Sequence, residues 1–293
     1  MDNIYEPILQ EVTPLQEKDC FYVVDRKKTC FTYPLHRHKE YELNFVYNAA
    51  GVKRIVGDSS ETIGGLDLVL ITSDCLEHAW LQEDCSSQDI REVTIQFLPD
   101  VPWIKKNQFL SIAQMFDKAR CGLVFPKEAI LKVYPLIDRL ASEKSGFHMV
   151  LHFLELLYEL SLFENVRTLS SPSYAHTQVF TTDSRIQKVQ RYVDENYGNE
   201  IKLCELARIV GMSPEAFSRY FHQSTGKALS DYLLDYRIGV AARSLIDTSD
   251  MIASIGYKCG FNNASYFNRV FKKRRGCTPK EFRDNYNKKR IIV

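Results

Sequence analysis

The chain has 293 residues, 45% of them hydrophobic and 12% aromatic, which suits a globular protein of about two domains and excludes a disordered one. No stretch approaches the roughly 18 consecutive apolar residues of a membrane helix, so we expect no membrane partner. The first ten residues contain two acids and a proline, unlike a secretory signal, and we therefore expect a cytoplasmic protein.

The net charge of +1 conceals an uneven distribution. Residues 183–293 contain 20 Lys/Arg and 12 Asp/Glu, a balance of +8, whereas the residues before them contain 18 and 25, a balance of −7. Such a split is expected when only the C-terminal part meets phosphate. The eight cysteines have no zinc-knuckle spacing, which favours reduced thiols.

The N-terminal region reads as short strands rich in β-branched and aromatic residues. These runs are 21–24, 43–47, 66–71 and 93–97. Because clusters of Gly, Asp and Ser divide them at near-regular spacing, residues 1–103 are predicted to form a barrel or sandwich.

Helical periodicity begins near residue 104 and defines a second region, 104–166. Apolar residues share one face in 109–116 and again in 130–140, where Pro135 predicts a kink or break. The most apolar helix, 147–163, has too many large residues for one narrow stripe, so we expect both sides to pack. It either covers the barrel or forms a dimer interface, and the two roles are compatible.

The segment 167–183 is rich in Ser and Thr with little apolar periodicity, and it is the predicted linker. Residues 184–293 are helical nearly to the end and contain a repeat. Phe217, Arg219, Phe221 and Gly226 recur 50 positions later as Phe267, Arg269, Phe271 and Gly276. A short amphipathic helix, a glycine turn and a second helix precede each glycine, which predicts two helix-turn-helix units.

The local signals of the repeat agree with this prediction. Gly211 and Gly260 end the two supporting helices. Ser213 is expected to cap the first outer helix, with Pro214 in its first turn, and Asn262 or Asn263 the second. The basic run 272–275 suits backbone phosphates. A doubled unit of this kind predicts a protein that contacts two successive major-groove segments of one double-stranded DNA site.

Residues 185–286 resemble the DNA-binding domain of the AraC/XylS family of bacterial transcription regulators. The resemblance rests on Gly-Phe-Asn-Asn-Ala-Ser-Tyr-Phe-Asn-Arg-Val-Phe-Lys-Lys (260–273), followed by Gly276 and Thr278-Pro279. It implies seven helices, with a long one at about 229–245 between the two units. Lys202 stands where the family often has a capping Ser or Thr, and Gly256 where a small Ala is usual.

The outer faces and the resemblance together give the candidate DNA-binding residues. They are Glu215, Ser218, Arg219, His222, Asn263, Ala264, Ser265, Asn268, Arg269, Lys272 and Lys273. The alternative for Arg219 and Arg269 is a salt bridge on a solvated face. Glu215 either meets a cytosine amino group or simply favours the helix dipole, and Asn268 meets adenine or phosphate.

A candidate metal set lies in the N-terminal region. His36 and His38 share one face of a strand, Glu42 has the same parity, and His78 comes from a later strand. Three imidazoles and one carboxylate suit a divalent transition metal such as Zn, Fe, Ni or Mn. The alternatives are a metal-free effector pocket and no ligand at all.

The stretch 36–80 also resembles the cupin barrel, a sensor domain of many AraC-type regulators. His36, His38, Glu42 and Gly51 match the family's first motif, and Gly65 and His78 match the second, although the usual proline before the last histidine is absent. The candidate effector-binding residues are His36, His38, Glu42, Tyr47, His78 and Trp80. Tyr41, Tyr47 and Trp80 are candidate stacking surfaces for a sugar or aromatic ligand, or core residues.

The sequence therefore predicts an α+β multidomain protein, a cupin-like β-barrel with following helices and then an all-α domain with two helix-turn-helix units at 184–293. The expected function is transcription regulation, not catalysis, with a small-molecule effector, a homodimer and the activating contact with RNA polymerase that is typical of the family. The alternatives are a metal-dependent cupin enzyme fused to a DNA-binding tail, and an accessory DNA-binding factor that needs no effector.

Overall fold

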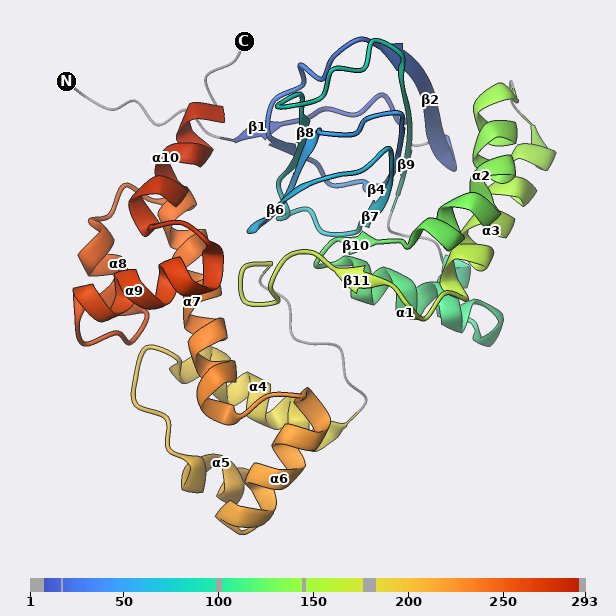
Figure 1. Ribbon diagram of the computed structural model, residues 1–293. Helices are drawn as coiled ribbons and strands as arrows, with labels where there is room; N and C mark the ends of the chain where they lie inside the picture. The colour runs from blue at the N-terminus through green and yellow to red at the C-terminus, as the bar shows by residue number, and fades with distance from the viewer. Residues whose placement is uncertain (1–7, 17, 99–101, 144–145, 176–182, 290–293) are drawn as a thin grey trace. The chain divides into compact units, whose positions relative to one another are not determined.

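The computed structural model describes residues 8–289 except 17, 99–101, 144–145 and 176–182. The chain forms two compact units, residues 8–170 and residues 171–289 (Figure 1). The first is β-rich with three long helices, and the second is helical. The α+β two-unit architecture predicted from the sequence is confirmed. All eight cysteines are free thiols.

Two sheets build the first unit, and they face each other across its interior (Figure 1). The five-stranded sheet has the order β1 (Leu9–Gln10), β3 (His36–Arg37), β8 (His78–Leu81), β5 (Lys53–Val56), β6 (Ser59–Thr62). The six-stranded sheet has the order β11 (Arg167–Thr168), β10 (Leu123–Val124), β7 (Leu66–Ile71), β4 (Tyr41–Tyr47), β9 (Ile90–Phe97), β2 (Phe21–Lys28). The pairing of β1 with β3 is parallel.

The six-stranded sheet has an apolar outer face and a polar inner face. In β4, Leu43 and Phe45 belong to the apolar core, whereas Glu42 and Asn44 line a cavity between the sheets. β9 alternates in the same way, because successive side chains of a strand point to opposite faces. The main hydrophobic core therefore lies outside the barrel, under the helices.

Three helices cover that outer face: α1 (Leu110–Ala119), α2 (Lys127–Ser142) and α3 (Phe147–Ser161). Two 3₁₀ turns, Pro102–Lys105 and Asn107–Phe109, come before α1. Of the kink or break predicted at Pro135, the break was wrong, because α2 continues through this residue. Pro135 lies on the exposed side of the helix, where the carbonyl that loses its N–H partner is able to bond water.

α3 buries only one of its two apolar sides within the described chain. Phe153, Leu156, Leu157 and Leu160 belong to the core. The exposed fractions are 71% for Phe147, 43% for Leu151 and 47% for Tyr158. The expectation that both sides pack was therefore wrong for a single chain, and the helix leaves an apolar stripe at the surface.

The segment expected as a linker, 167–183, has three parts. Residues 167–170 belong to the first unit, where β11 pairs with β10 and the Ser170 hydroxyl donates to Asp58 over 2.8 Å. Residues 171–175 belong to the second unit, with Tyr174 fully buried and the Arg243 guanidinium 5.2 Å from its ring centre. Residues 176–182 lie outside the described part of the chain.

The second unit contains the seven helices that the family resemblance implies. They are α4 (Ser184–Asn196), α5 (Leu203–Ile209), α6 (Pro214–Thr225), α7 (Leu229–Asp247), α8 (Ile252–Lys258), α9 (Ala264–Arg275) and α10 (Pro279–Lys289). α5 and α6 form one helix-turn-helix, α8 and α9 form the other, and α7 joins them (Figure 1). No helix in the described ranges is long and apolar enough to cross a membrane.

Candidate DNA-binding helices and effector cavity

The first helix-turn-helix is held by local hydrogen bonds. The Ser213 hydroxyl caps α6 by accepting from the Ala216 N–H over 3.3 Å, and Gly226 ends the helix in the left-handed conformation, with φ 70°. Lys202 gives α5 no side-chain cap. The Glu205 carboxylate compensates by accepting from the Lys202 N–H over 3.2 Å, the return half of a capping box.

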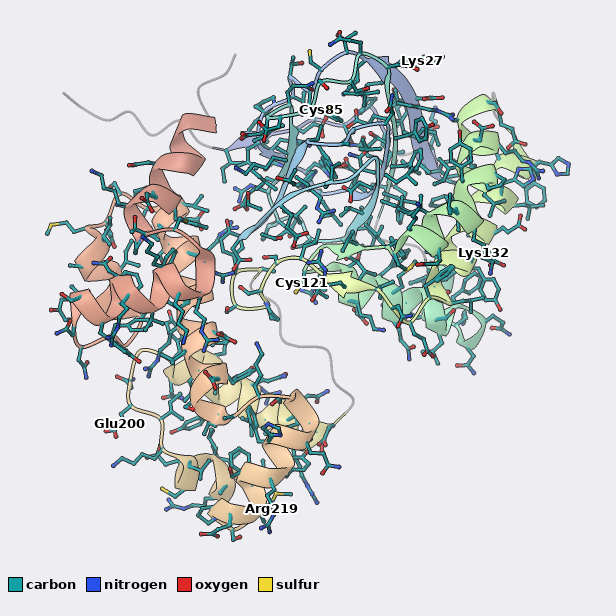
Figure 2. The ribbon with its side chains drawn as sticks, in the orientation of Figure 1. Lys27, Cys85, Cys121, Lys132, Glu200 and Arg219 are labelled. Carbon is teal, nitrogen blue, oxygen red and sulfur yellow. The ribbon has the colours of Figure 1, made fainter. Side chains whose placement is uncertain are left out.

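One side of α6 is exposed and polar. Phe217 and Phe221 are buried, 0% and 1% exposed, on the other side. The exposed residues follow the helical spacing i, i+3, i+4, i+7, and we call them the α6 stripe: Glu215, Ser218, Arg219 and His222. Figure 2 shows Arg219 at the outer surface of α6. Among the described residues no ion pair involves Arg219, so the alternative of a salt bridge is not realised.

The second helix-turn-helix repeats this construction. Asn263, not Asn262, caps α9 by accepting from the Tyr266 N–H over 2.9 Å, and Gly276 ends the helix with φ 76°. The structure also gives Gly256 a physical reason. A Cβ atom at that position would lie 2.9 Å from the Phe267 ring, so a side chain as small as Ala would force the ring to shift. The loss of helix propensity is therefore accompanied by closer packing of α8 on α9.

The exposed side of α9 has the same spacing as that of α6. Its members are Ser265, Asn268, Arg269 and Lys272, which we call the α9 stripe, and all four are exposed. The guanidinium of Arg269 lies 5.5 Å from the centre of the Tyr266 ring, a cation–π contact that supports it without neutralising its charge. Asn263 is also exposed and Ala264 is half-buried, both at the first turn of α9.

The basic run that ends α9 divides into two pairs. Lys272 and Lys273 are exposed and make no ion pair with any described residue. Arg274 instead contacts the carboxylates of Asp231, at 2.6 Å, and Asp235, at 3.2 Å. Arg275 is half-buried and donates to the Ser171 hydroxyl over 3.2 Å. These two arginines thus contact groups of the domain itself, and the contact of the whole run with phosphate stays a prediction.

The three predicted histidines meet in the interior of the first unit. His36, His38 and His78 are 7%, 2% and 1% exposed. Each Nδ1 atom lies 2.9–3.0 Å from a backbone carbonyl oxygen, those of Pro34, Glu40 and Leu76. A carbonyl only accepts, so each Nδ1 carries a proton and each Nε2 is left for the interior. His38 Nε2 lies 3.1 Å from the Glu42 carboxylate, which also only accepts, so the His38 ring carries a proton on both nitrogens; burial opposes this charge, but the hydrogen bond to Glu42 raises the pKa of His38. Metal-binding histidines are usually oriented in this way.

Glu42 completes the group. Its carboxylate lies 3.1 Å from His38 Nε2 and 3.6 Å from His78 Nε2, and it accepts from the Gln96 amide over 3.1 Å. Burial opposes the charge of Glu42, but the hydrogen bond from His38 and the nearby imidazoles outweigh it and lower the pKa of the carboxyl. Burial also lowers the pKa of His78 to about 3, so that ring is neutral.

These residues fit a divalent transition metal. One ligand atom from each of His36, His38, Glu42 and His78 can be chosen so that all four lie within 4.8 Å of one another. The Nε2 atom of His78 is buried without a hydrogen-bond partner, a costly state that a metal–nitrogen bond relieves. A metal requires neutral imidazoles and an ionised carboxylate, so its binding here would release the Nε2 proton of His38.

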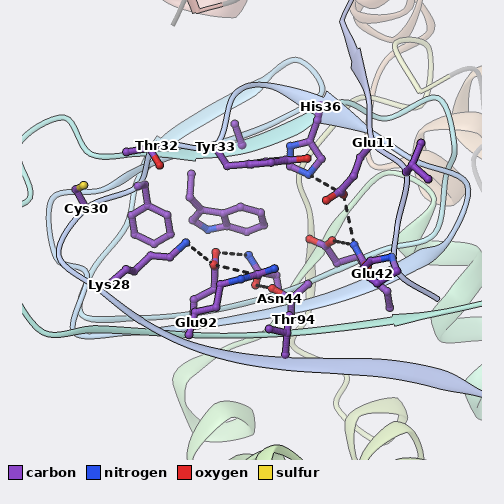
Figure 3. Close-up of a pocket in the computed structure, with 18 residues that line it drawn as sticks. Glu11, Lys28, Cys30, Thr32, Tyr33, His36, Glu42, Asn44, Glu92 and Thr94 are labelled. Carbon is purple, nitrogen blue, oxygen red and sulfur yellow. Dashed lines mark hydrogen bonds and ion pairs between the residues drawn. The ribbon is translucent and has the colours of Figure 1, made fainter. Parts of the chain in front are cut away.

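A cavity of about 420 Å³ adjoins this group, within the size range of small-molecule sites (Figure 3). His36, Glu42 and Trp80 line it, while His38 and His78 lie behind its wall. The Trp80 indole is fixed by a 3.0 Å hydrogen bond to Asp67.

Tyr47 is 48% exposed and does not line the cavity, so its assignment to the effector site was wrong. In β4, Tyr47 lies on the same face of the strand as Leu43 and Phe45, which point outward. Tyr41 packs on Phe97 and Phe116 as a core residue.

Most of the cavity's polar lining was missed from the sequence. The residues concerned are Glu11, Arg26, Lys28, Tyr33, Asn44, Glu92, Thr94 and Gln96. The Lys28 ammonium contacts Glu92 at 2.6 Å, and the Asn44 amide donates to the same carboxylate over 3.4 Å. The alternation of polar and apolar residues in 92–97 was visible in the sequence, but it also fits a strand with one solvated face, so it did not reveal that Glu92, Thr94 and Gln96 are buried.

The fold combines a β-rich unit that contains a cavity with two helix-turn-helix units, each with an exposed polar stripe, and the helix-turn-helix units define a class of DNA-binding protein. A family model described as a helix-turn-helix domain matches residues 206–285. The chain is 24% identical over 91% of its length to the HTH-type transcriptional activator RhaR of Mannheimia succiniciproducens, of which the match covers 92%.

Two further relatives match the helical part. An HTH-type transcriptional regulator in the cgkA 5' region of Pseudoalteromonas carrageenovora is 33% identical over 38% of this chain and 65% of its own length. The arabinose operon regulatory protein of Escherichia coli is 33% identical over 34% of this chain and 35% of its own. Residues 206–285 therefore belong to the helix-turn-helix domain family, and the chain is similar to transcription regulators of the AraC type, which confirms the prediction of a DNA-binding transcription regulator.

Proposed function

We propose that this regulator binds one DNA site through α6 and α9, which enter successive major-groove segments about one helical turn apart. The observation that carries the proposal is the repetition of the exposed stripe. The stripe at positions 215, 218, 219 and 222 has its equivalent 50 residues later at 265, 268, 269 and 272. Both helices have a side-chain cap at the equivalent position, Ser213 or Asn263, and both end at a left-handed glycine.

The two stripes and the first turn of α9 supply the proposed DNA contacts. Arg219 and Arg269 suit guanine, which accepts two hydrogen bonds from a guanidinium in the major groove, and Asn268 suits adenine or phosphate. Lys272 and Lys273 contact phosphates. Asn263, Ala264, Ser265, Ser218 and His222 complete the surface, and Glu215 serves chiefly the dipole of α6.

The interior of the first unit is the proposed effector site. The support is a cavity lined by polar side chains and by the aromatic residues Phe31, Tyr33 and Trp80, in a position where a stable barrel would otherwise be filled by apolar side chains. His36, His38, Glu42 and His78 would hold a divalent metal, which would supply a positive charge for an electron-rich group of the effector. Elemental analysis of the purified protein tests this, with loss of the metal expected in His78→Ala.

The apolar stripe of α3 is proposed to bind a second copy of the chain. Phe147, Leu151, Leu154 and Tyr158 follow the spacing i, i+4, i+7, i+11, the seam of a two-helix coiled coil. Leu151→Glu should convert a dimer to a monomer in sedimentation velocity. A monomeric wild type would contradict this part of the proposal. A cytoplasmic location and activation through RNA polymerase are proposed from the family and from the relatives named as activators.

Selection of random duplex DNA with the full-length protein, at one fixed salt concentration, tests the DNA-binding proposal. We expect an enriched motif with two elements about ten base pairs apart. One element alone would mean that one of the two helices does not contact bases. No enrichment, with or without added Zn²⁺, would contradict sequence-specific binding by the chain.

A further inference from the structure

Glu11 places a second carboxylate beside the histidines. One of its carboxylate oxygens, Oε2, lies 3.6 Å from His36 Nε2 and 3.8 Å from His38 Nε2. The same oxygen lies 3.4 Å from the Gln96 side-chain nitrogen, which also donates to Glu42. Glu11 hydrogen-bonds Tyr33, whose pKa rises to about 12 through burial and the charge of Glu11. Figure 3 shows Glu11 pointing into the cavity next to His36 and Glu42.

The groups around the Glu11 carboxylate and the segment that carries it differ in how firmly they are held. His36 and His38 are anchored through their Nδ1 atoms, and Gln96 is 4% exposed in the middle of the sheet on β9. Glu11 follows β1, a strand of two residues whose parallel pairing with β3 extends only through the Glu11 N–H to the Arg37 carbonyl. Leu9 is 43% exposed and Val12 is 91% exposed. A segment with so little buried surface opens at low free-energy cost.

The barrel thus provides a carboxylate-binding site whose present occupant comes from a weakly held segment. Two carboxylates, those of Glu11 and Glu42, share one amide donor, and two like charges this close disfavour each other unless cationic groups lie nearby. The unpartnered Nε2 of His78, 1% exposed, shows that the group has further capacity to bind. The cavity continues from this point toward Trp80 and Glu92, with room for the rest of a small molecule.

We propose that Glu11 is a built-in competitor of the effector. His36, His38 and Gln96 form a carboxylate site, and the carboxylate of a small organic acid displaces Glu11 and with it the segment 8–14. The inference rests on the proposed effector cavity and adds two statements to it: the effector is an anion, and its binding frees the N-terminal segment. That release gives the ligand a structural output without any change in the sheets themselves.

Acetate and acetamide are the matched probes, because they have the same shape and differ in charge. Both measurements use the full-length protein, with and without Zn²⁺. The rate of hydrogen–deuterium exchange in segment 8–14 measures its release, and the NMR chemical shift of the Gln96 side-chain amide measures ligand binding. Acetate should accelerate exchange in 8–14 and leave β2 unchanged, and acetamide should do neither. In Glu11→Gln, exchange in 8–14 should be fast without ligand, and acetate should bind about tenfold more tightly, a difference of about 1.4 kcal/mol.

Glu40→Gln is the control. The Glu40 carboxylate also lies near His38, at 3.9 Å, but on the Nδ1 side, and its side chain is 18% exposed against 19% for Glu11. This variant should behave as the wild type. Two outcomes would overturn the proposal. Acetate would bind wild type and Glu11→Gln with equal affinity, or acetate would not accelerate exchange in 8–14. DNA binding measured on the same samples keeps the outcomes separate, because a chain that binds no DNA refutes the proposed function whatever acetate does.

Discussion

The two recognition helices have the same framework and different exposed faces. The rings of Phe217 and Phe221 lie 5.6 Å apart under α6, and those of Phe267 and Phe271 lie 5.7 Å apart under α9. The α6 stripe contains one acid and one arginine, whereas the α9 stripe contains an arginine and a lysine and no acid. The repeated part is therefore what folds the unit, and the divergent part is the proposed DNA-contacting surface. We expect α9 to supply more of the DNA affinity than α6.

The largest expected effect is the loss of an arginine from either stripe. Arg269→Ala and Arg219→Ala should each weaken binding to the selected site by ~1–3 kcal/mol, and each should relax sequence choice at its own position, about ten base pairs from the other. Binding measured on a panel of single-base variants of the site checks this. Uniform weakening on every sequence would instead make the arginine a phosphate contact.

A smaller effect, specific to the second unit, is expected from the lysines that end the α9 stripe. Lys272→Ala and Lys273→Ala should each reduce the slope of log affinity against log salt by about 1, because each releases one counterion fewer. Arg274→Ala is the matched control. Its charge is taken up by Asp231 and Asp235, so its slope should stay close to that of the wild type. An equal loss of slope in all three variants would contradict the division of the basic run.

Structural features that depend on residues close together in the sequence could be predicted, and features that depend on distant segments could not. Caps, terminal glycines and the offset of 50 are local, so both helix-turn-helix units were predicted in detail. The histidine group was also predicted, but the argument from one regular strand was wrong. His36 lies on β3 and Glu42 on β4, which belong to the two facing sheets, and the fold brings them together across the interior. Glu11 could not be predicted, because its position depends on the parallel pairing of β1 with β3, which no local pattern specifies. The error at Tyr47 was avoidable, since the alternation of side chains in β4 places Tyr47 on the same outward face as Leu43 and Phe45.

The smallest expected effect concerns the acid of the α6 stripe. Glu215→Gln removes a carboxylate that repels phosphate, so nonspecific DNA affinity should rise a few-fold, while the loss of its favourable position near the start of α6 should cost up to about 1 kcal/mol of stability. Titrations with random-sequence DNA and thermal unfolding measure the two effects. Glu200→Gln, an exposed carboxylate outside the stripe, is the control. Loss of a preference for cytosine at one position would show that Glu215 reads a base.

The outward placement of the main core has a consequence for how the proposed effector site could change its specificity. The outer face of β4 and β9 packs against the helices through Leu43, Phe45, Val93 and Ile95. The alternate positions face the cavity and are occupied by Asn44, Glu92, Thr94 and Gln96. Substitutions at the cavity positions leave the packed layer intact. The residues that stabilise the fold and the residues that line the cavity thus lie on opposite faces of the same strands. Mutations can therefore change the cavity lining without changing the packed core.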